Sequence, residues 1–124
     1  MSKEGLLDQQ SREKLPELYS NEEMGLDALV QAKFFLPGSG WTWYASEGSP
    51  VDEDGYYDTD KPKVDFFFFG LVSGLEVELG YFALSELESV GSPLGLPIER
   101  DLYFEPKSLR ELMEWHDQQR RSSP

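Results

Sequence analysis

The stretch from Val64 to Val72 constrains the fold of this chain more than any other, because it carries four consecutive phenylalanines, Phe66 to Phe69. Successive side chains of a β-strand point to opposite faces, so this run places aromatic rings on both faces of a sheet. Such a strand is stable where other elements cover both of its faces. The run therefore predicts an interior strand around which the rest of the chain packs.

Further strand and helix signals flank this run. Alternating or apolar segments bounded by Gly, Pro and Ser predict strands over 28–36, 41–47, 64–72 and 76–84, and a short edge strand within 98–104. Helices are expected up to Lys14, from Asn21, from Ser85 and after Ser108, and Ser20, Ser85 and Ser108 each have a glutamate three residues later, the spacing of a capping box. The last helix has an apolar stripe of Leu109, Leu112, Met113 and Trp115. The prediction is an α+β fold, in which an antiparallel sheet of about four strands carries short helices at the N- and C-terminal ends.

The length of the chain indicates a single domain. A chain of 124 residues has the usual size of one compact unit, and no segment of 1–124 is long and polar enough to divide it. Two parts are expected to lack regular structure: an acidic loop over residues 48–62 and a frayed polar tail over residues 118–124.

Charge and composition exclude several functions. The chain has 11 Lys and Arg against 24 Asp and Glu, a net charge of −13, which argues against direct binding of nucleic acid or of an anionic membrane. Cysteine is absent, which excludes disulfides, thiol nucleophiles and cysteine-based metal sites. His116 is the single histidine, and we expect it on the surface near the end of the last helix. With no apolar run of membrane-spanning length, a cytoplasmic location is expected.

The acidic side chains form the first candidate site. They are expected on the 48–62 loop and on the strand that begins near residue 76, and they are Asp52, Glu53, Asp54, Asp58, Asp60, Glu76 and Glu78. A calcium loop of the EF-hand type is excluded, because Gly55 is the fourth residue counted from Asp52 rather than the sixth and the closing glutamate is missing. We therefore predict no metal and no cofactor, and interpret these carboxylates as a surface that binds a partner or keeps the protein in solution.

Two other groups of residues are alternatives. Trp41 and Trp43 share one strand face, which can stack on a ligand, although packing in the core is the favoured interpretation. Arg100 lies between Glu99 and Asp101 and close to Tyr103, an arrangement that suits an ion-pair cluster linking the sheet to a helix, or a ligand site. No set of nucleophile, base and metal ligands accompanies them, so no catalytic residue is predicted.

Four stretches of the chain resemble a known family. They are LPELY at 15–19, GWTWYA at 40–45, ELGYF at 78–82 followed by LSELE at 84–88, and GLPIERDLYF at 95–104. Together they resemble the small bacterial family known as domain of unknown function 2958, over roughly residues 15–106. The resemblance implies an accessory protein carried by plasmids, phages and integrated elements, and an association with inhibitors of CRISPR RNA-guided nucleases. It implies no catalytic residues.

The expected function is therefore non-enzymatic binding of another protein. The partner would be a basic nucleic-acid enzyme such as a CRISPR nuclease, whose groove accepts carboxylates in place of phosphates. Two alternatives stay open: a small-molecule or peptide binding module that uses the aromatic face at Trp41 and Trp43, and a small enzyme around Glu99, Arg100 and Tyr103.

Overall fold

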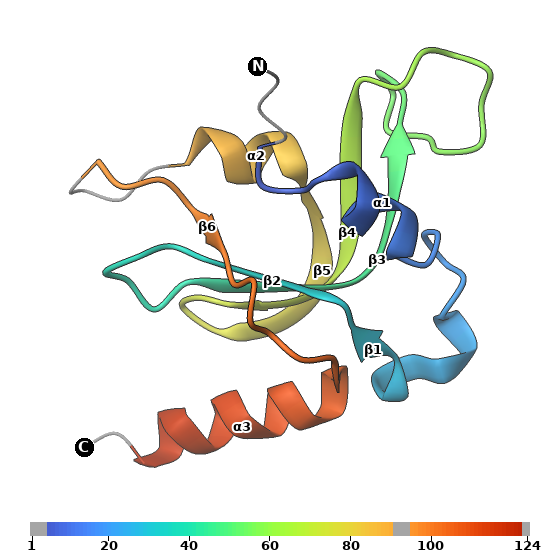
Figure 1. Ribbon diagram of the computed structural model, residues 1–124. Coiled ribbons are helices and arrows are strands. Elements are labelled where there is room, and N and C mark those ends of the chain that lie inside the picture. Colours follow the sequence, from blue (N-terminus) through green and yellow to red (C-terminus); the bar gives the residue numbers. More distant parts are fainter. Residues whose placement is uncertain (1–4, 91–94, 123–124) are drawn as a thin grey trace.

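The computed structural model describes residues 5–90 and 95–122. Within these ranges the chain forms helices and strands that Figure 1 shows in order from blue to red. They are α1 (Gln9–Lys14), the 3₁₀ helix η1 (Glu22–Asp27), β1 (Leu29–Val30), β2 (Ala32–Phe35), β3 (Thr42–Val51), β4 (Asp65–Ser73), β5 (Val77–Ala83), α2 (Leu84–Ser89), β6 (Glu99–Arg100), β7 (Lys107–Ser108) and α3 (Leu109–Ser122). The fold is α+β, as the sequence predicts.

One antiparallel sheet organises the described residues. Its strand order is β5-β4-β3-β2-β6, so it has five strands instead of about four, and β6 supplies the predicted edge strand with only two residues. The phenylalanine run lies in β4, which pairs with β3 on one side and β5 on the other. The predicted interior strand is thereby confirmed.

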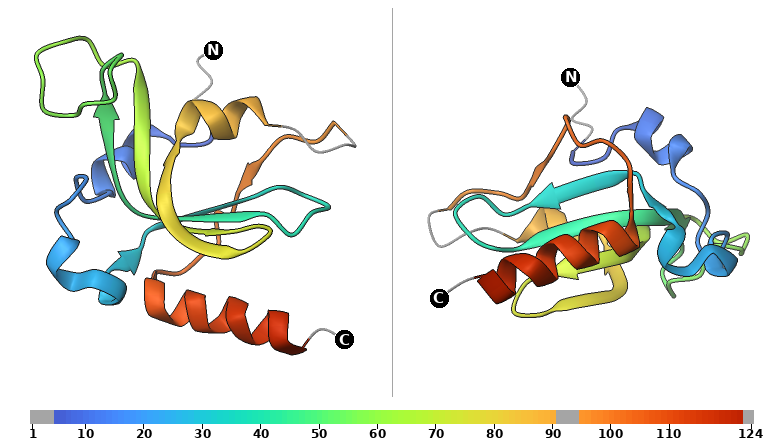
Figure 2. Two further views of the ribbon diagram at one scale, coloured as in Figure 1. Left: turned by 180° about the vertical axis from the view of Figure 1, so that it is seen from behind. Right: turned by 90° about the horizontal axis from the view of Figure 1, so that it is seen from below.

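Different helices cover the two faces of this sheet, as both views of Figure 2 show. On the first face, α1 and α2 lie over a core that includes Phe34, Phe66 and Phe68. On the second face, α3 packs with Leu109 and Leu112 against a second cluster of the sheet. Burial on both faces is why β4 tolerates aromatic side chains at successive positions.

The predicted boundaries are wrong in three places. The acidic loop begins later than residue 48, because β3 continues to Val51 and pairs with β4 along its whole length. The predicted strand 28–36 divides at Gln31, since β1 pairs with β7 while β2 pairs with β3. The tail is not frayed at 118–122: α3 reaches Ser122, and Arg120 donates hydrogen bonds to the carbonyl oxygens of Gly74 (2.6 Å) and Leu75 (2.9 Å). The rest of that tail lies outside the described residues.

The helix caps follow the sequence in part. At α3 the backbone N–H of Glu111 donates to the Ser108 hydroxyl at 3.1 Å, as the capping-box spacing predicts. At α2 the helix starts earlier than Ser85, and the carboxylate of Glu86 accepts the N–H of Ala83 at 3.0 Å. None of the helices in 5–90 and 95–122 combines the length and the apolar character that crossing a bilayer requires.

Candidate functional site

A surface pocket of about 360 Å³ opens on the second face of the sheet. Its walls come from the segment at the start of η1, from β3, β4 and β5, and from the first residue of α3. They are Tyr19, Asn21, Glu22, Gly25, Leu26, Ala28, Ser46, Glu47, Phe69, Leu79, Tyr81 and Leu109. The lining thus includes two carboxylates and three aromatic rings but neither lysine nor arginine.

A β-bulge in β3 turns Glu47 toward this pocket. The pairing with β4 shifts between Ala45 and Glu47, so that Ser46 is the extra residue and Glu47 stands opposite Phe69. Without the bulge, Glu47 would follow the alternation of the strand to the first face, because a shift of one residue exchanges the two faces. With it, Glu47, Phe69 and Tyr81 form one row across β3, β4 and β5.

The Glu47 carboxylate is buried and holds the chain at the start of η1. Only 4% of the residue is exposed. One oxygen accepts the backbone N–H of Tyr19 at 2.9 Å, and the other accepts that of Asn21 at 2.7 Å. The capping box predicted from Ser20 does not form: the N–H of Ser20 donates to the carbonyl oxygen of Glu17, and η1 begins after Asn21 without a side-chain cap.

Tyrosine rings line the pocket beside Glu47: Tyr19 and Tyr81 form part of its wall, and Tyr57 packs against Tyr19. The ring centroid of Tyr19 lies 5.9 Å from that of Tyr57 and 6.1 Å from that of Tyr81. Desolvation, followed by a hydrogen bond with Tyr19, raises the pKa of Tyr81 to about 12. Burial and the neighbouring Asp58 raise the pKa of Tyr57 as well. These phenols stay uncharged at neutral pH, so the pocket offers aromatic faces to a ligand.

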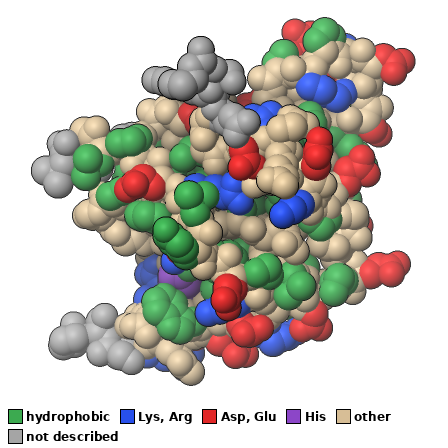
Figure 3. Space-filling view, in the orientation of Figure 1, with side chains coloured by type: hydrophobic (Ala, Val, Ile, Leu, Met, Phe, Trp, Pro, Cys, Tyr) green, Lys and Arg blue, Asp and Glu red, His purple; other side chains and the backbone are tan. Residues whose placement is uncertain are grey.

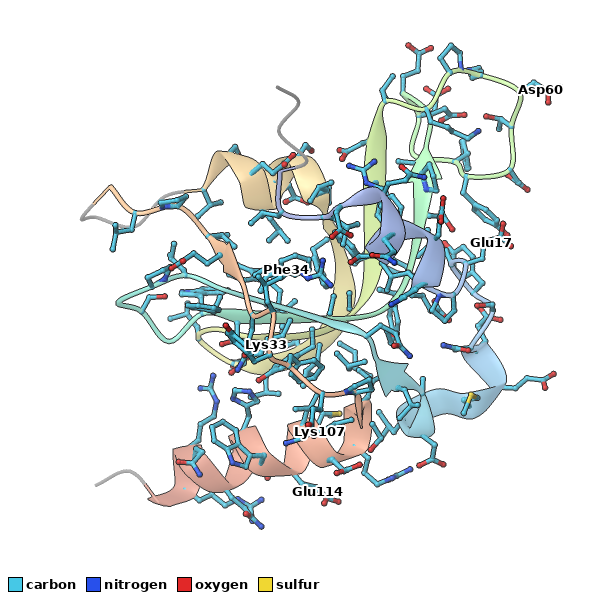
Figure 4. The ribbon with its side chains drawn as sticks, in the orientation of Figure 1. Glu17, Lys33, Phe34, Asp60, Lys107 and Glu114 are labelled. Carbon is cyan, nitrogen blue, oxygen red and sulfur yellow. The ribbon has the colours of Figure 1, made fainter. Side chains whose placement is uncertain are left out.

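Exposed carboxylates from two segments form what we call the acidic edge, and one of them, Glu22, also lines the pocket. It consists of Glu17, Glu22 and Glu23 beside and within η1, and of Glu53, Asp54, Asp58 and Asp60 in the β3–β4 loop. Figure 3 shows acidic side chains gathered along this side of the molecule. In Figure 4, Glu17 and Asp60 lie on that side, whereas Lys33 and Lys107 lie between the sheet and α3.

Asp52 does not belong to this exposed surface, which corrects its place among the predicted partner-binding residues. It is 2% exposed, and its carboxylate accepts the N–H groups of Asp54 (2.8 Å) and Tyr56 (3.0 Å) and the hydroxyl of Thr59. The bond from Thr59, with those from the two backbone groups, lowers the pKa of Asp52. Asp52 thus orders the loop that displays the other carboxylates.

Glu76 and Glu78 lie away from the acidic edge. They stand at the β4–β5 turn, at the far end of β4 from the acidic loop, and that strand spans nine residues, or about 27 Å. There they line a shallow cleft with Trp41. The structure therefore divides the predicted acidic set into two separate places.

The prediction that Trp41 and Trp43 pack in the core is wrong for Trp41. Trp43 is buried, but Trp41 is 37% exposed and stacks on it with ring centroids 5.9 Å apart. The physical reason is its position: Trp41 precedes β3 and lies against Gly74, where the sheet ends.

Arg100 and Tyr103 do not converge on one site. The guanidinium of Arg100 donates to the Ser11 hydroxyl at 2.7 Å and lies 3.9 Å from the carboxylate of Asp8. It thereby links β6 to α1, although its ion-pair partner is not one of the neighbouring acids. Tyr103 is 93% exposed. Within 5–90 and 95–122, no group of three or more His, Asp or Glu side chains could hold a metal ion.

His116 is half-buried between α3 and the sheet, which corrects the predicted surface position. Its Nε2 lies 2.6 Å from the Tyr44 hydroxyl, and its Nδ1 lies 3.1 Å from the Ser73 hydroxyl. The helix period accounts for this, because Leu109, Leu112, Met113 and His116 follow the i, i+3, i+4, i+7 pattern of one face. Trp115 falls off that face and is 54% exposed.

Lowering the pH from about 8 to about 5 is expected to destabilise the protein through His116. Burial, together with the charges of Arg120 and Lys33, lowers the pKa of His116 below 6.5. The unfolded chain therefore takes up this proton at a higher pH than the folded chain, so stability falls as the pH drops below about 6.5. Chemical denaturation of the protein and of a His116→Gln variant measures the effect, and the two pH dependences should diverge below pH 6.5. Parallel curves would contradict the expectation.

Sequence reasoning missed the pocket residues Glu47, Tyr19 and Tyr81. A weak signal was available for Glu47, which is the one charged residue within 42–51. None was available for the two tyrosines, which are far apart in the chain: Tyr81 is placed by the pairing of β5, and Tyr19, outside the sheet, is placed by the bond of its N–H to Glu47.

Fold and site together define an α+β protein with an acidic, aromatic pocket on one face of its sheet. The chain belongs to the family described as "Protein of unknown function (DUF2958)", whose profile matches residues 6–123. The resemblance seen in residues 15–106 thus extends over nearly the whole chain. Comparison with curated proteins gave no match, and neither did comparison with solved structures.

Proposed function

We propose that this chain is a non-enzymatic accessory protein of a mobile element and that it works by docking its acidic edge on a basic surface of another protein. The observation that carries the proposal is the grouping of seven exposed carboxylates from two separate segments on one side of the molecule. The β3–β4 loop keeps a net negative charge, because Lys61 and Lys63 stand against five carboxylates, those of Asp52, Glu53, Asp54, Asp58 and Asp60.

The partner is a nucleic-acid enzyme, such as a CRISPR RNA-guided nuclease, and the acidic edge docks in its basic groove. Carboxylates held on an ordered loop present negative charge much as phosphates do, and long-range attraction speeds the encounter of oppositely charged surfaces. Asp52 supports this role by ordering the loop from within. A non-enzymatic role is supported by Arg100, the centre of the alternative enzyme site, whose guanidinium is engaged by α1.

Neutralising the loop part of the acidic edge is expected to slow association with a guide-loaded nuclease roughly tenfold or more. The variant is Glu53→Gln, Asp54→Asn, Asp58→Asn and Asp60→Asn, with Asp52 left in place because the loop needs it. Surface-based binding kinetics at low and high salt measure the effect, and the binding of the parent should weaken steeply as salt rises.

The matched control carries Glu76→Gln and Glu78→Gln, which remove acidic charge at the other end of the sheet. It should associate as fast as the parent. The proposal is wrong if the loop variant binds as well as the parent, or if the control loses as much as the loop variant.

A second candidate function is a binding module at Trp41. The exposed indole beside a cleft lined by Val72, Leu75, Glu76 and Glu78 favours it. A Trp41→Ala variant that keeps its fold and loses binding, while the loop variant binds normally, would place the partner on this aromatic face.

A further inference from the structure

Glu47 is a buried carboxylate without a cation. Its two oxygens accept backbone N–H groups, and among the described residues it takes part in no ion pair. Each oxygen keeps a further lone pair, since a carboxylate accepts about four hydrogen bonds. A buried charge is costly unless hydrogen bonds and an opposite charge compensate it. The pocket therefore contains a buried negative charge that a bound cation would compensate.

Tyr19, which forms part of the aromatic wall of the pocket, has an unfavourable backbone conformation. Tyr19 has a φ of 72°, in the left-handed region that residues other than glycine rarely adopt. The bond from its N–H to Glu47 holds this conformation, which brings its ring against Tyr57 and Tyr81. Strained backbone of this kind is often found at binding sites. Tyrosine faces beside a carboxylate are the surroundings in which proteins bind organic cations.

We propose that this pocket binds the guanidinium group of an arginine side chain supplied by the basic partner. The inference rests on the proposed function, because the basic partner named there is what supplies the arginine. Guanidinium suits the site because its planar group stacks on aromatic rings and donates two parallel N–H bonds to one carboxylate. An ammonium group carries the same charge but provides neither the plane nor the fork. The arginine would anchor a contact whose long-range attraction comes from the acidic edge.

Titration of the intact protein with N-acetyl-L-arginine amide tests the site without any partner. In amide NMR spectra, the signals of Tyr19, Asn21 and Glu47 should shift, with a dissociation constant in roughly the millimolar range. The neutral isostere N-acetyl-L-citrulline amide should leave them in place, and N-acetyl-L-lysine amide should bind more weakly. The inference is overturned if the arginine probe shifts none of these signals, if citrulline shifts them equally, or if lysine binds as tightly.

Two variants assign the binding to the pocket. Glu47→Gln keeps the size of the side chain and removes its charge, and should weaken binding of the arginine probe roughly tenfold or more. Because Glu47 also holds the start of η1, Tyr81→Leu provides a second variant that leaves both N–H contacts intact and removes one aromatic face. It should weaken binding severalfold. Unchanged binding by a folded Tyr81→Leu variant would place the probe elsewhere and contradict the inference.

The inference and the proposed function can fail separately. If the nuclease binds in a salt-dependent manner while the arginine probe does not bind, the pocket inference fails and the acidic edge stands. If the probe binds through Glu47 but neutralising Glu53, Asp54, Asp58 and Asp60 leaves nuclease binding unchanged, the proposed docking surface fails instead.

Discussion

Replacing Phe68 with alanine is expected to lower the free energy of unfolding by about 3–5 kcal/mol. Phe68 is fully buried, and its ring centroid lies 5.6 Å from that of Phe34 and 5.1 Å from those of both Phe66 and Phe82. The truncation removes apolar contact on all these sides and leaves a cavity that β4 cannot close, since this strand is paired on both sides.

Chemical denaturation followed by circular dichroism measures this loss. Phe67→Ala is the matched control, because Phe67 is the same residue type in the same strand but is only partly buried. Its loss should be clearly smaller, about 1–2 kcal/mol. If both variants lost equal stability, Phe67 and Phe68 would not differ in burial, and the arrangement of β4 would be contradicted.

Gly70→Ala is expected to cost about 3 kcal/mol or more, for a different reason. Gly70 faces Ala45 next to the bulge in β3, where the two backbones approach closely. A Cβ added at Gly70 would stand 1.7 Å from the carbonyl oxygen of Tyr44, an atom of the backbone that no side-chain rotation can move. The methyl group therefore forces the two central strands apart or removes the bulge.

Gly80→Ala is the control for this change. Gly80 pairs with Gly70 across β4 and β5, but a Cβ there meets no atom within 4 Å. Its stability should stay near that of the parent or rise by a few tenths of a kcal/mol, because alanine restricts the unfolded chain more than glycine does. Thermal unfolding measures the stability of both variants. A Gly70→Ala variant as stable as the parent would argue against the bulge.

The same bulge connects stability with the pocket. If Gly70→Ala shifts the register of β3, Glu47 turns toward the first face and the row of Glu47, Phe69 and Tyr81 is lost. The close approach at Gly70 is thus part of what places a carboxylate among the tyrosines.

Much of the fold could be predicted from local patterns. The phenylalanine run in β4 identifies an interior strand because no other element accommodates rings on both faces. The Ser108 and Glu111 pair marks the start of α3, since capping depends only on residues within one turn. The helix period is also a local property, and it predicts that Leu109 and Leu112 are buried. Extended by one turn, the same period places His116 on the buried face, where it contacts Tyr44.

The sequence by itself determined which segments form strands and helices and which side of most of them is apolar, because these properties depend on neighbours within a few residues. Only the tertiary structure decided where the charged groups lie relative to one another. It separated Glu76 from the acidic edge and brought Tyr19 and Tyr81 to Glu47. The physical reason is that strand register, one bulge within it and the hydrogen bonds of Glu47 join residues far apart in the chain, and no local pattern encodes those contacts.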